Sequence, residues 1–170
     1  AGSNAFDTGD SESGFGPSVV SSCSGTTCTV TRRTTVGPLL QLQQIFKKNA
    51  SGERSINITM NVKNLTGAPV AGVVLRRQAD FDIDNTTNNR FSSTERDSVF
   101  AWNAPADSTS EGHSLVLTNR KKPAGVFPLA KVTSNILDSS CNPAHAADGA
   151  PVQGDFGATI QYNLGTLNPG

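Results

Sequence analysis

The sequence has few charged residues and few aromatic ones. Only 16% of its 170 residues are charged, and the 14 basic side chains balance the 14 acidic ones. Such a chain has no basic field that would attract a phosphate backbone, so we expect no nucleic-acid partner. Aromatic residues make up 6%, with one tryptophan and one tyrosine. They offer little for a long cleft that stacks on sugars.

Long hydrophobic runs are also missing. The longest apolar run, Val70–Leu75, is the size of a strand. It is far shorter than the ~20 residues of a membrane-spanning helix, so we expect no transmembrane segment. The low charge and the many Ser, Thr, Asn and Gly residues are typical of an exported, β-rich protein. We therefore expect a secreted or cell-surface location.

Cysteine is scarce, and its spacing is informative. Cys23 and Cys28 enclose the turn-forming segment Ser-Gly-Thr-Thr between two β-prone runs, which predicts a disulfide across a hairpin. Cys141 lies far away in a Ser-Ser-Cys-Asn-Pro segment. This odd cysteine is free, pairs with Cys23 or Cys28 instead, or bonds to a neighbouring chain.

Alternating apolar and polar residues predict an all-β fold. Between Arg54 and Asn64 the apolar side chains occupy every second position, as in a strand with one buried face. Turn residues recur at intervals of about ten to fifteen residues, the spacing of a sandwich. Leu39–Phe46 also fits a helical turn, but its alternation favours a strand. The expected strands are Thr29–Val36, Leu39–Phe46, Arg54–Asn64, Val70–Ile83, Ser98–Trp102, Ser114–Thr118, Ala130–Ile136 and Ala158–Leu164.

The start of the chain differs in composition from the rest. Residues 1–17 are rich in Gly, Ser and Asp and contain little apolar material, which predicts an extended arm that is flexible unless a partner orders it. The remaining residues, 18–170, have the length of one domain with its own core.

Two segments resemble a known family. Ile58–Leu75 reads as two alternating strands joined by a Gly-Ala-Pro turn, and Ile160–Gly170 as a strand followed by leucine, glycine, leucine and a Pro-Gly turn. Both are similar to the conserved-repeat immunoglobulin-like domain of unknown function from bacterial and archaeal cell-surface proteins. The resemblance implies an immunoglobulin-like β-sandwich of about eight antiparallel strands. In that family one more strand follows the Pro-Gly turn, so either the chain continues beyond Gly170 or another chain completes that edge.

An acidic segment is the candidate metal site. On an extended strand Asp80, Asp82 and Asp84 share one face, where their charges repel one another. Calcium, which takes six to eight oxygen ligands, would relieve this repulsion with Asn85 as a further ligand. Neighbouring arginines offer the alternative of simple ion pairs.

No catalytic constellation stands out in the sequence. The chain lacks a Gly-x-Ser-x-Gly nucleophile elbow, and its two histidines, His113 and His145, fall in turn or loop segments where surface positions are expected. Paired carboxylates also suit glycoside hydrolysis, but that reaction needs an aromatic-lined cleft. We expect a protein that is not an enzyme.

These observations favour a structural or assembly module of an extracellular fibre, surface layer or adhesin. The arm, the odd cysteine and an incomplete sheet edge suggest self-association or binding to other surface proteins by strand addition. The alternative is a calcium-dependent carbohydrate-binding module, in which Asp80, Asp82 and Asp84 hold the metal and Trp102 stacks on a glycan. A hydrolase on a β-sandwich scaffold is a third hypothesis.

Overall fold

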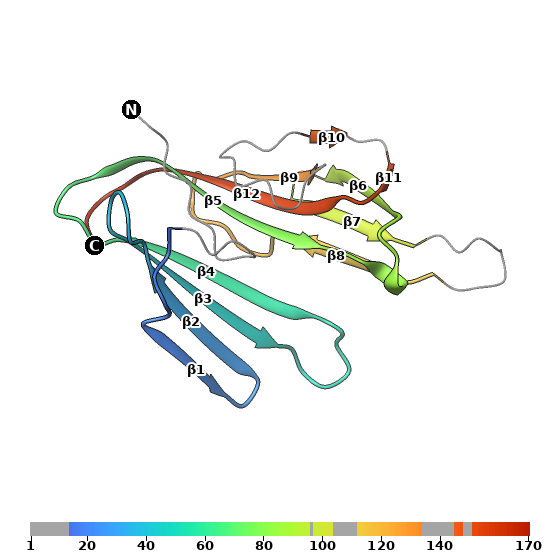
Figure 1. Cartoon of the computed structure of the whole chain (residues 1–170), viewed down its shortest axis with the longest axis horizontal. Coiled ribbons are helices and arrows are strands. Elements are labelled where there is room, and N and C mark those ends of the chain that lie inside the picture. The colour runs from blue at the N-terminus through green and yellow to red at the C-terminus, as the bar shows by residue number, and fades with distance from the viewer. Residues whose placement is uncertain (1–13, 96, 104–111, 134–144, 148–150) are drawn as a thin grey trace. The chain divides into compact units, whose positions relative to one another are not determined.

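In the residues that the structure describes, β-strands are the only regular secondary structure apart from one short 3-10 turn. The structure is a computed structural model, and it describes residues 14–95, 97–103, 112–133, 145–147 and 151–170. Its strands form three antiparallel sheets of four strands each (Figure 1). The all-β prediction is therefore confirmed, while the immunoglobulin-like topology stays a prediction. Most of the predicted arm, residues 1–13, and Cys141 lie outside the described residues.

The three sheets have simple strand orders. The first runs β1 (Val20–Ser24), β2 (Thr27–Arg33), β3 (Leu40–Lys48) and β4 (Ile56–Asn64). The second runs β10 (His145–Ala147), β9 (Pro128–Thr133), β12 (Gly157–Leu167) and β5 (Val70–Asp80). The third runs β11 (Val152–Gly154), β6 (Asn89–Glu95), β7 (Ser98–Trp102) and β8 (Ser114–Thr118).

The chain divides into two compact units. One comprises Ala1–Val73 with Gly165–Gly170, and the other comprises Val74–Leu164. We call them the first and the second unit and describe each by itself. The prediction of one domain over residues 18–170 stays a prediction.

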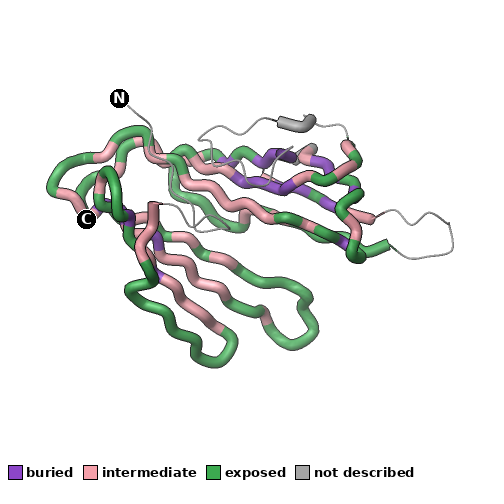
Figure 2. Tube along the Cα trace, viewed as in Figure 1, coloured by how far each residue is buried: buried purple, intermediate pink, exposed green. Residues whose placement is uncertain are grey.

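The first unit contains the sheet β1-β2-β3-β4. Its β4 shows the predicted period of two, because Ile58, Met60 and Val62 are half-buried while the residues between them are exposed. Across the pairing with β3, Phe46 lies opposite Ile58. The segment that also fitted a helical turn is therefore a strand. Figure 2 shows that the strands of this sheet are mostly half-buried or exposed.

A disulfide closes the β1–β2 hairpin of the first unit. Cys23 and Cys28 lie directly opposite each other in the register and are bonded, as predicted from their spacing. Between them Gly25 has a φ of 57°, a conformation that glycine adopts without steric cost. The bond fixes the alignment of two strands whose side chains bury little surface.

Asn64, at the end of β4, is a buried residue whose side chain takes part in four hydrogen bonds. Its amide group donates to the carbonyls of Ala68 and Leu167, both at 2.9 Å. Its Oδ1 atom accepts from the backbone N–H and the hydroxyl of Thr66. The backbone carbonyl of Asn64 accepts from Gly170 N at 3.2 Å. One buried amide thus ties the end of the chain to the turn after β4.

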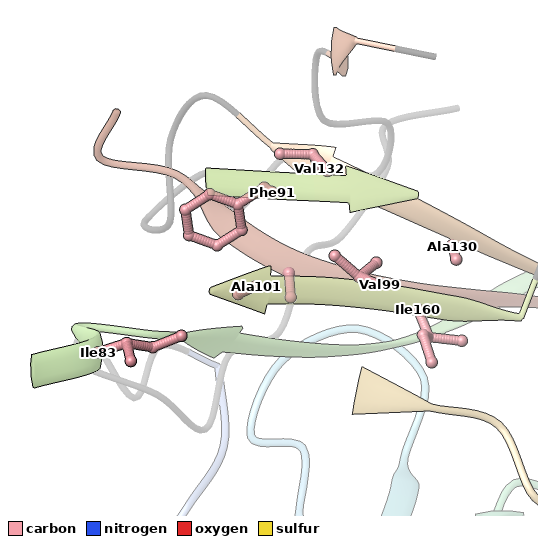
Figure 3. Packing of buried hydrophobic residues seen from close by; sticks show 8 residues of the cluster. Ile83, Phe91, Val99, Ala101, Ala130, Val132 and Ile160 are labelled. Carbon is pink, nitrogen blue, oxygen red and sulfur yellow. The ribbon is translucent and has the colours of Figure 1, made fainter. Parts of the chain in front are cut away.

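The second unit is a sandwich with a single core cluster. Residues from β6, β7, β9 and β12 pack together with Ile83 between the second and third sheets (Figure 3). Within this core Phe91 is 1% exposed, and its ring meets that of Phe156 edge to face with the centroids 6.0 Å apart. The buried members of the core are Ile83, Phe91, Val99, Ala101, Ala130, Val132, Ala158 and Ile160.

The acidic segment after β5 departs from the prediction. The strand was expected to continue to Ile83, but β5 ends at Asp80 and Ile83–Asn85 forms a 3-10 turn. Asp84 and Asn85 have φ values of 59° and 57°, which only a few non-glycine residues adopt and which Asp and Asn tolerate best. The extended geometry that placed three carboxylates on one face is therefore wrong.

Candidate functional site

Three carboxylates gather at one end of the second unit. Asp80, Asp82 and Asp155 each offer an oxygen within 4.8 Å of the others, and all three are exposed. Asp80 closes β5, Asp82 follows it, and Asp155 follows β11. Carboxylate oxygens are the ligands that hard cations such as Ca²⁺ prefer. This acidic cluster is a group that could hold a metal ion.

Asn89 joins the two chain segments that carry the acidic cluster. Its side chain is fully buried and donates to the backbone carbonyl of Phe81 at 2.9 Å, and also to that of Thr86. In the register of the third sheet, Asn89 lies opposite Gly154, the residue before Asp155. One buried asparagine therefore fixes the loop between Asp80 and Asp82 next to the strand that presents Asp155.

The predicted ligands divide between two places. Asp80 and Asp82 belong to the acidic cluster, whereas the Asp84 carboxylate contacts the Nδ1 atom of His113 at 2.5 Å and accepts from Asn103 Nδ2 at 3.2 Å. Asn85 is exposed at the 3-10 turn. The left-handed backbone of Asp84 turns its side chain toward β7 and β8, so the third carboxylate of the cluster comes from Asp155 instead.

The Asp84 carboxylate is held in its charged form. Desolvation raises its pKa, but the hydrogen bonds from Asn103 and His113, together with the charge on His113, lower the pKa by more. The net result is a pKa below the usual value of an aspartate. His113 itself is largely exposed, in agreement with the surface position expected for it.

The second candidate feature is the edge strand β8. Among the described residues β8 pairs only with β7, so its other side is an open sheet edge. Its sequence, Ser-Leu-Val-Leu-Thr, contains neither a charge nor a proline, the residues that commonly protect edge strands. Leu115 and Val116 are 47% and 46% exposed.

The hydrogen bonds to β7 show which way the backbone groups of β8 point. Asn103 N donates to His113 O, and Asn119 N donates to Asp97 O, just beyond the two ends of the β7–β8 register. In an antiparallel pair such bonded residues alternate with residues whose N–H and C=O point away. The N–H and C=O groups of four residues therefore point toward β7: His113, Leu115, Leu117 and Asn119. Ser114, Val116 and Thr118 direct their N–H and C=O groups to the open edge.

Apolar side chains continue from β8 onto β7. Phe100, which is 39% exposed, lies directly opposite Val116. Trp102, the predicted stacking residue, follows two positions later on the same face of β7 and lies opposite Ser114. It is half-buried. The open edge is thus flanked by two exposed apolar side chains, those of Val116 and Phe100.

Sequence reasoning missed two parts of these sites. Asp155 lies more than seventy positions beyond Asp82, and only the pairing of β11 with β6 brings it near. The strand β8 was predicted with its correct bounds, but alternation within one strand says nothing of its place in a sheet. The strand Ser114–Thr118 has no charged residue, but the central strand β7 has none either, so the lack of charge did not identify β8 as an edge.

Comparison with known proteins adds no relative: no protein-family model, curated protein or solved structure matches the chain. The resemblance to the immunoglobulin-like surface domain therefore stays a prediction. Among the described residues, no helix is long and apolar enough to cross a membrane.

Proposed function

We propose that the chain is a non-catalytic assembly module of an extracellular or cell-surface structure, which receives an extended segment of a partner at the open edge of β8. The observation that carries this proposal is the edge itself, with its outward backbone groups at Ser114, Val116 and Thr118. A strand that pairs there satisfies these groups through main-chain hydrogen bonds. Contacts with Val116 and Phe100 supply apolar burial.

Two further features support an extracellular module of this kind. The chain contains the Cys23–Cys28 disulfide. In most proteins a disulfide persists only in an oxidising compartment, such as the space outside the cell. The predicted sandwich class commonly serves in surface proteins as a scaffold for binding. The exposed apolar edge gives such a scaffold a site of attachment.

A synthetic strand peptide tests the proposal. The probe is a capped peptide of alternating Val and Thr with a lysine at each end, and its binding is measured by calorimetry and by NMR shifts of the β8 amides. We expect binding that shifts Ser114, Val116 and Thr118 most. A peptide N-methylated at every second residue is the control, and we expect it not to bind because it lacks the donors. Equal binding of both peptides, or binding of neither, would refute strand addition at β8.

The acidic cluster supports a second candidate function, calcium-dependent carbohydrate binding. In this function Asp80, Asp82 and Asp155 hold the ion, which would supply further coordination positions for sugar hydroxyls. Trp102 ends β7 opposite Arg90, the residue after the buried Asn89, so it lies at the same end of the third sheet as the acidic cluster. It is the described side chain best suited to stack on a sugar ring there.

Calcium should raise the thermal stability of the chain if the acidic cluster binds it. At ten times the dissociation constant, binding adds about 1.4 kcal/mol to the free energy of unfolding. We expect Asp155→Asn to abolish this gain and Asp84→Asn to retain it, because Asp155 belongs to the acidic cluster and Asp84 does not. Calorimetry with calcium, with magnesium and with chelator measures the effect. A stability that is the same in all three solutions would exclude the site, and a gain lost only in Asp84→Asn would restore the set predicted from the sequence.

A further inference from the structure

We infer that the strand received at β8 is β8 of a second copy of this chain, so that the module forms a symmetric dimer through one continuous eight-stranded sheet. This inference rests on the proposed function, because it names the partner of the same edge. The third sheet ends at β8 in the described residues. Two copies of its four strands would therefore join edge to edge about a two-fold axis, as in other isologous interfaces.

The positions of the open backbone groups select one register. Ser114, Val116 and Thr118 each present one N–H and one C=O at the edge. When the two-fold axis passes between the two Val116 residues, Val116 lies opposite Val116 of the other copy, and Ser114 lies opposite Thr118 of the other copy. Every outward group of the strand then has a hydrogen-bonding partner. A shift of two residues in either direction leaves the outward groups at one end of each strand without a partner.

The side chains of β8 are self-complementary in this same register. The sequence Ser-Leu-Val-Leu-Thr reads nearly the same in both directions about Val116. In the antiparallel pair Leu115 faces Leu117 of the other copy. Leu117 already packs against the core of the second unit, whereas Leu115 is 47% exposed. The pairing therefore covers Leu115 and extends the hydrophobic core across the axis. On the other face of the sheet, the side chain of Val116 packs against Val116 of the second copy, beside Phe100.

The residues beyond the ends of β8 also have defined partners in this register. The register places Asn119 opposite His113 of the second copy and the exposed Arg120 opposite Gly112. His113 contacts the Asp84 carboxylate of its own chain. On an extended strand the side chain of Arg120 falls on the opposite face from that of His113, so this register brings no charged pair together at its ends. Within Gly112–Arg120 no like charges lie opposite each other in this register.

A charge-swap experiment tests both the partner and the register. Val116→Lys places two ammonium groups opposite each other on the axis, and Val116→Glu places two carboxylates there. We expect each variant alone to associate more than about tenfold more weakly than the parent chain, and an equimolar mixture of the two to regain the dimer. Sedimentation velocity over a concentration series measures the association. All chains carry Cys141→Ser, so that no intermolecular disulfide contributes.

Matched controls separate this result from a general loss of solubility or fold. Val36→Lys replaces a valine that is more exposed than Val116 but lies in the first unit, outside any strand, and we expect it to dimerise like the parent chain. Circular dichroism checks that both Val116 variants fold. Since the side chain of Val116 is half exposed and its N–H points away from β7, we expect unchanged spectra.

Each remaining outcome would overturn the inference. A parent chain that stays monomeric at millimolar concentration but binds the Val-Thr peptide would refute self-pairing and leave strand addition standing. A monomer that also fails to bind the peptide would refute both. A dimer that survives in both variants, or that the mixture does not restore, would place the interface elsewhere or in another register.

Discussion

Replacement of Phe91 by alanine is expected to lower the free energy of unfolding of the second unit by about 4 kcal/mol. Phe91 is 1% exposed and belongs to the core, where its ring packs against the ring of Phe156. Its removal forfeits the apolar contacts and leaves a cavity that the paired strands around it cannot fill. Trp102 is the single tryptophan and lies on β7 of the same unit. Its fluorescence in a denaturant titration therefore reports this loss.

Phe100→Ala is the matched control for Phe91→Ala. Phe100 comes from the neighbouring strand β7 but points to the outer face, where it is 39% exposed. We expect its removal to cost less than about 1.5 kcal/mol, since the side chain gives up less buried area and leaves no closed cavity. Equal losses in the two variants would contradict the assignment of the core to the inner faces of the two sheets.

The second large effect is expected for Asn64→Ala in the first unit. The side chain is 2% exposed and takes part in four hydrogen bonds, with the carbonyls of Ala68 and Leu167 and with both donors of Thr66. Alanine removes these four bonds, and although the Ala68 carbonyl keeps the Thr66 hydroxyl as a donor, the Leu167 carbonyl and the Thr66 N–H lose their partner at Asn64. At roughly 1 kcal/mol for each group that water does not replace, we expect a loss of about 3 kcal/mol.

Amide hydrogen exchange measures this loss locally. Leu65 N donates to Leu39 O, and Gly170 N donates to Asn64 O, so both amides report on the region that Asn64 holds together. We expect their exchange to become about a hundredfold faster in Asn64→Ala. Asn61→Ala is the control, because Asn61 is an exposed residue of the same strand with one side-chain bond, to Gln43. Similar exchange rates of these amides in Asn64→Ala and Asn61→Ala would contradict the view that the Asn64 side chain holds this region together.

Much of the secondary structure follows from the sequence alone. All eight expected strands overlap observed ones, and the bounds of β7 and β8 were predicted to the residue. The disulfide followed from a five-residue separation across a turn. These features are local: they depend on alternation and on turn residues that lie within a few positions of one another.

Four strands were missed, and each has a physical reason. The strand β1 is rich in serine and wholly exposed, so no alternation marks it. Phe91 is the one large apolar residue of β6, and β10 and β11 have three residues each. Such segments become strands because a neighbour pairs with them, and not because of their own propensity. Core position Phe91 could therefore not be found from its own strand.

The candidate sites depended on long-range pairing to a greater degree. The sequence placed Asp80 and Asp82 together, but it assumed that the strand continued to Asp84. The left-handed backbone at Asp84 turns this residue away from the cluster, and the pairing of Gly154 with Asn89 brings Asp155 into its place. Whether a strand lies at an edge is likewise a property of the whole sheet. The open side of β8 became visible only with the strand order β11-β6-β7-β8.

Amide exchange along β8 is the most direct test of the assembly proposal. In a dilute solution of the chain we expect the amides of Leu115 and Leu117 to exchange slowly, because their N–H groups are bonded to β7. The amides of Ser114, Val116 and Thr118 point to the open edge, and we expect them to exchange rapidly. Raising the protein concentration, or adding the Val-Thr peptide, should then slow these three amides together. Slow exchange at Val116 already in dilute solution would show that the edge is occupied within the chain. Rapid exchange under all conditions would show that no strand is received there.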